Sequence, residues 1–242
     1  MRRALRLGMT ALAVLGACSA APVAEAAPTG LFTIPTADLV PVRQWTFQLQ
    51  NGNTQLDDPG SVWSEPEPAP QSQFGLPGAR AEAGVDLVAV DAPSDYRAVA
   101  NVKVLLLGEG EDWPAVAAGV QQLGHGLDAA WYAVASRTLN YRSLQYQKFR
   151  AHHRNIRLHG VRLHAGVTGA AGTTRALAGS DVELSEHWIA QADWTSGPAR
   201  SATLGATWVL DARTSVQAAM LRGNDSHRVD GLQAGFTRQF AW

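Results

Sequence analysis

The chain has 242 residues, of which 46% are hydrophobic and 17% are charged, and its formal net charge is -1. This length allows one domain with a sizeable buried or lipid-facing surface. The charge shows none of the basic excess that is typical of nucleic-acid-binding proteins. The single cysteine, Cys18, excludes an intramolecular disulfide, so stability must come from packing and backbone hydrogen bonds.

The first residues have the pattern of an export signal. Three arginines lie within the first six residues, an apolar run follows over 7–17, and residues 24–26 (Ala-Glu-Ala) offer small side chains at a cleavage site. We therefore predict a signal peptide over 1–26 and a lead-in segment over 27–42. An alternative is that residues 15–18 (Leu-Gly-Ala-Cys) form a lipobox, which would lead to lipidation of Cys18. Either route exports the protein.

From residue 43 onward apolar and polar residues alternate with a period of two. Trp45, Phe47 and Leu49, for example, alternate with Thr and Gln. This alternation predicts strands with one apolar and one polar face, and the short Gly-, Pro-, Asp- and Ser-rich connections predict an antiparallel meander. We predict strands over 43–53, 79–90, 96–107, 114–123, 127–138, 156–168, 174–184, 187–196, 200–210, 214–222 and 230–242.

These eleven strands are an odd number, whereas single-chain bacterial outer-membrane barrels have an even number. The best candidate for a twelfth strand is Arg142–Arg150, and a ten-stranded barrel is the alternative. The Pro-rich segment Asp57–Pro77 shows no periodicity, and we expect it to form an extracellular loop between the first two strands.

Two features favour a membrane barrel over a soluble β-domain. Tryptophan and tyrosine recur near the predicted strand ends, as interfacial girdles require. The chain also ends in an alternating strand whose aromatic residues Phe236, Phe240 and Trp242 are typical of the C-terminal insertion signal of outer-membrane barrels. We therefore predict an all-β fold, an antiparallel up-and-down transmembrane β-barrel of about 12 strands, over residues 43–242 in the outer membrane.

Residues 30–37 (Gly-Leu-Phe-Thr-Ile-Pro-Thr-Ala) resemble the opening element of the YjbH-like exopolysaccharide-biosynthesis outer-membrane proteins. Shorter similarities follow in the same order, at residues 101–106, 113–120, 132–137, 178–183 and 189–194. The additional domain of longer members is missing. The resemblance implies an outer-membrane barrel associated with capsule or exopolysaccharide secretion, and it carries over no catalytic residue.

The polar faces of the predicted strands identify candidate lumen or rim residues. A basic segment near residue 160 could attract anionic sugar or phosphate. The alternative is that its arginines and histidines pair with lumen acids such as Glu82, Asp86, Glu183 and Asp193, because buried charges require partners. The candidate lumen and rim residues are Gln48, Glu82, Asp86, Lys103, Arg157, His159, Arg162, His164 and Asp193.

The sequence predicts no enzyme, cofactor or metal. The pairs Ser226-His227 and Ser185-His187 contain hydrolase residue types but sit at predicted turns, outside any nucleophile motif. The adjacent histidines His152 and His153 would point to opposite faces of a strand.

The resulting hypothesis is a non-enzymatic outer-membrane barrel that supports exopolysaccharide secretion or envelope biogenesis, as a narrow pore or scaffold. Its expected partners are outer-membrane lipid, the barrel-assembly machinery, and an anionic polysaccharide or other secretion components. Two alternatives remain: a lipid- or polysaccharide-modifying enzyme, and a soluble periplasmic β-domain tethered through Cys18.

Overall fold

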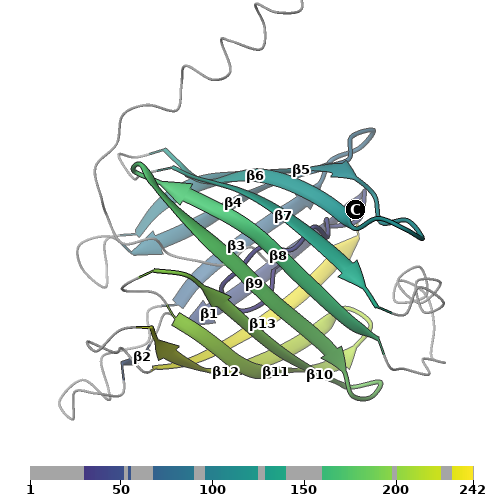
Figure 1. Ribbon diagram of the computed structural model, residues 1–242, viewed down its shortest axis with the longest axis vertical. Helices are drawn as coiled ribbons and strands as arrows, with labels where there is room; N and C mark the ends of the chain where they lie inside the picture. Colours follow the sequence, from purple (N-terminus) through teal and green to yellow (C-terminus); the bar gives the residue numbers. More distant parts are fainter. Residues whose placement is uncertain are drawn as a thin grey trace, which may run out of the picture.

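A computed structural model describes residues 30–51, 54–55, 68–89, 96–124, 129–139, 160–197, 201–224 and 231–241. They form one antiparallel sheet that closes on itself (Figure 1). The strands are β1 (Gln44–Asn51), β2 (Thr54–Gln55), β3 (Pro68–Gly75), β4 (Ala81–Ala89), β5 (Tyr96–Leu107), β6 (Ala115–Leu123), β7 (Ala130–Thr138), β8 (Val161–Ala170), β9 (Thr173–Glu183), β10 (Trp188–Thr195), β11 (Ser201–Asp211), β12 (Thr214–Gly223) and β13 (Gly231–Ala241).

The sheet closes where β1 pairs with β13, in a register that runs from Gln44↔Ala241 to Gln50↔Gly235. The short β2 continues the same edge, because Thr54 pairs with Leu232 and Gln55 with Gly231 of β13. β1 and β2 therefore occupy one position, and twelve strands surround the lumen. This confirms the prediction of a 12-stranded antiparallel barrel. We call the end where β1 begins and β13 finishes the terminal end, and the opposite end the distal end.

The twelfth strand is β3, so the prediction of a loop throughout Asp57–Pro77 is wrong over Pro68–Gly75. β3 pairs with β1 along its length, but its pairing with β4 begins only at Gln71. Pro68 and Pro70 therefore lie before the pairing with β4 begins. A proline's missing N–H removes no hydrogen bond to β4 at these positions. The predicted strand Arg142–Arg150 lies outside the described residues.

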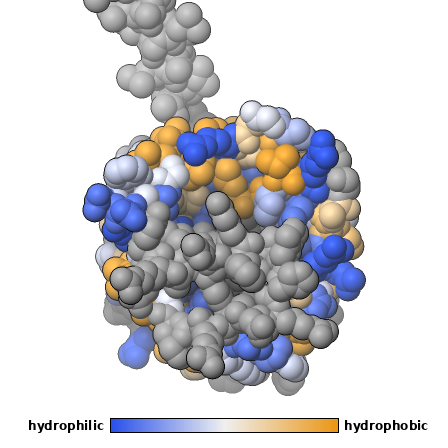
Figure 2. Space-filling view, turned by 90° about the vertical axis from the view of Figure 1, so that its right-hand side faces the viewer, coloured by the Kyte–Doolittle hydropathy of each residue, from blue (hydrophilic) through white to orange (hydrophobic). Residues whose placement is uncertain are grey.

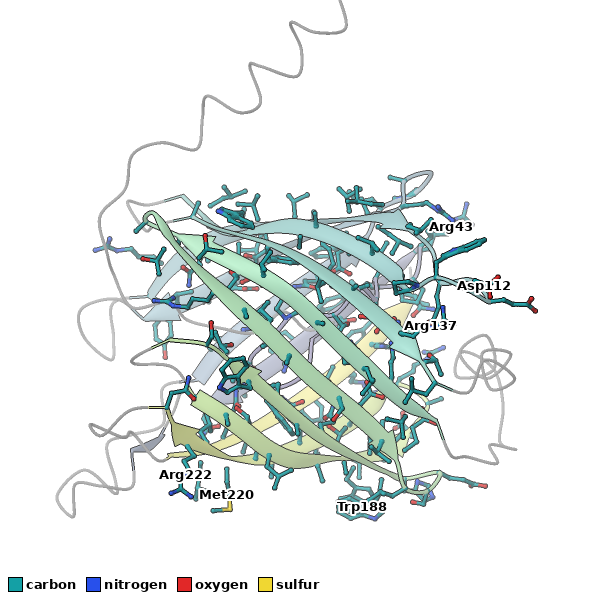
Figure 3. The ribbon with its side chains drawn as sticks, in the orientation of Figure 1. Arg43, Asp112, Arg137, Trp188, Met220 and Arg222 are labelled. Atoms are coloured by element: carbon teal, nitrogen blue, oxygen red, sulfur yellow. The ribbon has the colours of Figure 1, made fainter. Side chains whose placement is uncertain are left out.

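The outer surface of the barrel is apolar. Leu204 and Met220 are neighbours on β11 and β12 and are 67% and 64% exposed. Met220 and Trp188 point away from the wall, whereas Arg43 and Asp112 lie at the terminal end (Figure 3). Hydrophilic residues occupy much of that end's rim (Figure 2). The soluble-domain alternative is therefore wrong, because it requires these apolar side chains to pack in the interior.

Aromatic residues gather on the outer surface at the terminal end. The ring of Trp45 stacks on Phe240, with centroids 4.3 Å apart, and on Phe74, with centroids 6.0 Å apart. Trp188 and Trp208 stack across β10 and β11 at 5.8 Å. This is the arrangement of an interfacial girdle, where amphipathic rings sit at the headgroup level. No helix in the described ranges is long and apolar enough to cross a membrane.

The interior is filled from the chain's own N-terminal side. Residues 30–40, which we call the plug, run inside the barrel, and residues 41–43 connect them to β1 at the terminal end (Figure 1). Phe32 and Ile34 of the plug are fully buried, and Leu31, Ala37 and Val40 are at most 3% exposed. The predicted lead-in segment thus contains the element that occupies the lumen.

Candidate functional site

The inner face of the barrel is polar and holds seven of the nine predicted lumen residues. Gln48, Glu82, Asp86, Lys103, Arg162, His164 and Asp193 are each at most 9% exposed. Arg157 and His159 lie outside the described residues. The other buried polar side chains of the strands are Thr46, Gln50, Gln71, Gln73, Asn101, Gln122, Ser136, Thr138, Thr195, Thr203, Thr207, Thr214 and Gln233.

The first part of the plug is bound by three distant strands. The Asp193 carboxylate of β10 accepts the backbone N–H of Thr33 at 2.9 Å and the Thr33 hydroxyl at 2.6 Å. The side-chain amides of Gln50 on β1 and Gln233 on β13 both donate to the carbonyl of Phe32, each at 3.3 Å. Backbone groups of the plug that have no sheet partner are therefore satisfied by side chains of the wall, as buried polar groups require.

The last part of the plug is bound by an ion pair between β4 and β5. Lys103 lies 3.0 Å from Glu82, its cross-strand neighbour. The Lys103 ammonium also donates to the carbonyls of Asp38, at 2.7 Å, and Thr36, at 3.3 Å, while Glu82 accepts the Val40 N–H at 2.6 Å. All three ammonium protons thus have acceptors, which a fully buried lysine needs.

Arg162 of β8 connects the plug to the rim. Its guanidinium lies 3.0 Å from Asp38 of the plug and 2.8 Å from Glu109 of the β5–β6 turn. Burial raises the pKa of Asp38, but the positive charges beside it, that of Arg162 foremost, outweigh that effect and hold the pKa of this carboxyl below its ordinary value. Asp38 is therefore ionised at neutral pH and binds the plug to the wall.

A chain of hydrogen bonds begins at the plug and runs along the inner face of the wall, from β7 through β8 to β9. The N–H of Ala37 donates to the Ser136 hydroxyl at 2.9 Å, and that oxygen lies 2.8 Å from Nδ1 of His164. Nε2 of His164 lies 2.9 Å from Asp181. The consistent assignment has Ser136 donating to Nδ1 and Nε2–H donating to Asp181. A serine, a histidine and an acid are thus aligned, but Ser136 is fully buried and its oxygen is capped by the plug.

Apolar contacts complete the seat of the plug. Leu31 and Ile34 form a buried cluster with Leu177 of β9, while Ala37 packs against Ala117, Tyr132 and Val134. Gly179 faces the first cluster, and a Cβ there would lie 2.5 Å from a Leu31 methyl and 2.8 Å from an Ile34 methyl. A larger residue at 179 would therefore require the ends of the Leu31 and Ile34 side chains to shift.

The partners of the basic residues differ from those expected. Arg162 pairs with Asp38 and Glu109, and His164 with Asp181, whereas the expected acids were Glu82, Asp86, Glu183 and Asp193. For Arg162 the cause is the plug and the β5–β6 turn, whose contacts depend on closure of the barrel, whereas the partner of His164 lies on the neighbouring strand β9. The motif at residues 30–37 was the available signal, because it forms most of the plug.

Of the two turn pairs considered for catalysis, the structure describes Ser185 and His187, whose hydrogen bonds are those of a turn. Ser185 caps its own turn by accepting the N–H groups of His187 and Trp188, and Nδ1 of His187 lies 3.0 Å from the carbonyl oxygen of Val209. Ser226 and His227 lie outside the described residues.

Two small cavities lie among the residues of the described lumen. A cavity of about 20 Å³ is lined by Gln71, Asp86, Asn101 and Gln122 among others, and one of about 10 Å³ by Glu82, Lys103 and Tyr132 among others. Each holds about one water molecule. Neither cavity has room for a sugar ring.

Comparison with known proteins supports the fold. No family model and no curated protein sequence matches the chain. Among solved structures, a KdgM porin in complex with disordered oligogalacturonate matches with a TM-score of 0.50 and 6% identity, over 82% of this chain and 99% of that one. A second KdgM porin structure matches with a TM-score of 0.49 and 7% identity, over 82% of this chain and 99% of the other. At this identity the likeness shows the barrel architecture alone.

Proposed function

We propose that the protein is a non-enzymatic outer-membrane channel, held closed by its own N-terminal plug, that conducts a saccharide chain of the cell envelope when the plug leaves. The plug itself is the observation that carries this proposal. It is bound by side chains from seven strands, β1, β4, β5, β7, β8, β10 and β13. If the plug served only to fill the lumen, apolar packing would suffice, because buried ion pairs seldom add net stability.

The barrel dimensions support a narrow pore. Diameter grows with strand number, and a 12-stranded barrel lies between the filled 8-stranded barrels and the open 16- to 18-stranded porins. Removal of the plug would expose a lumen lined with amides, hydroxyls and paired charges. Such groups bind the hydroxyls of a sugar and replace the water that it gives up.

A role in exopolysaccharide secretion is supported by the resemblance to the YjbH-like proteins. The residues that carry it most clearly, 30–37, are those that form most of the plug. The element that resembles that family is therefore the one that fills the lumen here. Other secretion components at the terminal end, where the plug joins β1, are the partners that would release it.

The proposal can be tested in planar bilayers with the full chain. Thr33→Val and Asp38→Asn each remove one plug-side contact and leave the wall intact. We expect the parent protein to be mostly silent and the double variant to show discrete channels. Exposed Asp211→Asn at the β11–β12 turn is the matched control. A folded double variant, judged by its heat-modifiable band shift, that conducts no better than the control would contradict the proposal.

Hydrolysis in the lumen is a second candidate function, because Ser136, His164 and Asp181 are aligned by two hydrogen bonds. Here the serine faces Nδ1, whereas the serine proteases present Nε2, and the N–H that caps its oxygen belongs to the plug. A fluorophosphonate probe on the Thr33→Val and Asp38→Asn double variant decides the matter. Labelling that is lost in Ser136→Ala would support an enzyme; no labelling leaves Ser136 as a plug contact.

A further inference from the structure

A polar pocket on the inner wall lies outside the contacts of the plug. It is the cavity of about 20 Å³, lined by residues of β3, β4, β5 and β6, and no plug residue contributes to it. Asp86 is 9% exposed and Gln71 6% exposed. The side-chain amide of Asn101 donates to one oxygen of Asp86 at 2.6 Å. Within the described residues the other oxygen, Oδ1, has no hydrogen-bond partner, and neither has Oε1 of Gln71.

The unpartnered atoms of this pocket are both acceptors. The remaining oxygen of Asn101 is already used, because it accepts the backbone N–H of Gln122 at 3.1 Å. A buried acceptor without a donor is costly, and the cost is recovered when a ligand supplies an O–H or N–H group. A cavity of about 20 Å³ admits one group the size of a water molecule, such as a sugar hydroxyl or an ammonium.

The described cations near this pocket already have partners, including Arg97 of β5, which lies opposite Val88. The buried cations of the described lumen already face carboxylates: Lys103 faces Glu82, and Arg162 faces Asp38 and Glu109. Asp86 has no ion pair within the described residues, so no cation of this part of the chain is paired with it. A uronate or phosphate group beside it would be desolvated next to another acid group, with no cation paired to that acid.

From this pocket we infer that the open lumen binds a saccharide without negative charge, either neutral or amine-bearing, whose O–H or N–H groups bind Asp86 and Gln71. The inference rests on the proposed function and specifies its substrate class. It differs from the notion of an anionic polysaccharide that the basic sequence segment suggests. It also separates this chain from the porin of similar fold that was solved with oligogalacturonate.

Binding to the folded, detergent-solubilised double plug variant tests the inference without requiring conduction. The probes are oligomers of matched length: neutral cello-oligosaccharide, amine-bearing chitosan oligomers, and oligogalacturonate. We expect one or both of the first two to bind at least about tenfold more tightly than oligogalacturonate, and Asp86→Asn to weaken that binding about tenfold. Asp211→Asn, an exposed carboxylate outside the lumen, should change nothing.

Preferential binding of oligogalacturonate, or unchanged binding in Asp86→Asn, would overturn the inference. These outcomes are independent of the channel proposal. If the same variant binds neutral or amine-bearing oligomers through Asp86 but never conducts, the pocket assignment stands and the channel function fails. If it conducts but prefers the anionic oligomer, the channel function stands and the substrate class fails.

Discussion

The contact between Thr33 and Asp193 offers a direct measure of how firmly the plug is bound. Thr33→Val keeps the shape of the side chain and removes the hydroxyl that donates to the carboxylate at 2.6 Å. A hydrogen bond to a charged group contributes roughly 1.5–3 kcal/mol. The undocked population of the plug should therefore rise about tenfold to more than a hundredfold. Asp193→Asn weakens both hydrogen bonds to Thr33, and adding Thr33→Val to it should cost less than Thr33→Val alone.

A single reporter cysteine makes this change measurable, because the chain has no cysteine other than Cys18. Ile34→Cys in a Cys18→Ser background places a thiol at a fully buried position of the plug. When opening and closing are fast, the rate of maleimide labelling follows the open population. We expect labelling to accelerate by the factor above in Thr33→Val. An unchanged rate in a barrel that keeps its band shift would refute the view that these hydrogen bonds hold the plug.

Three further predictions follow from the wall and the plug. Lys103→Met leaves the Glu82 carboxylate buried without its cation, and should lower the free energy of unfolding by about 3–5 kcal/mol in urea titrations. Combining Lys103→Met with Glu82→Gln removes both members of the pair and should lower it by about 1 kcal/mol or less. Met220→Arg on the lipid-facing surface should lower the free energy of unfolding in lipid vesicles by about 2–4 kcal/mol. Arg222→Ala, nearer the distal end on the same strand, should change it little. Equal effects of the two substitutions would contradict the assignment of the outer face. The pKa of Asp38 is lowered, so its pairing with Arg162 is complete above its ordinary value of 3.8 and is lost as the pH falls through the lowered pKa; the difference in the free energy of unfolding between Asp38→Asn and the parent, measured in urea titrations, should stay constant from pH 8 to pH 5 and vanish in strong acid.

The strands could be predicted from the sequence because the signal for each is local. The alternation of Trp45, Phe47 and Leu49 with polar residues reports directly which side chains face lipid. β3 could not be predicted from the sequence, because the evidence for this strand is its position in the sheet and not a local pattern. Pro68 and Pro70 disqualify it as a central strand, and only its position between β1 and β4 shows that the edge beside them is unpaired.

The lumen residues could be predicted in part, since inward polarity follows from the same alternation. Seven of the nine candidates are buried in the described lumen. Their partners could not be predicted, because the acids and carbonyls that Arg162 and Lys103 contact lie far away in sequence. Asp38, for example, is 124 residues from Arg162. The plug has no period of its own, since its N–H and C=O groups bind side chains of the wall rather than a neighbouring strand.

The attachment of the plug restricts how the proposed channel can open. The plug is joined to β1 through residues 41–43, and Arg43 adopts a left-handed φ of 61° at this junction. A released plug therefore stays tethered at the terminal end, and its eleven residues could extend about 35–40 Å from that point. Since the contacts at Asp38 and Val40 lie nearest the tether, a pull from the terminal end would break them before that at Thr33. In the proposed channel, a saccharide arriving from the terminal end would likewise meet the ion pairs of Arg162 and Lys103 first. A partner bound at the terminal end could therefore release the plug stepwise, by breaking its charged contacts one after another. Release by thermal motion must instead break all of these contacts together.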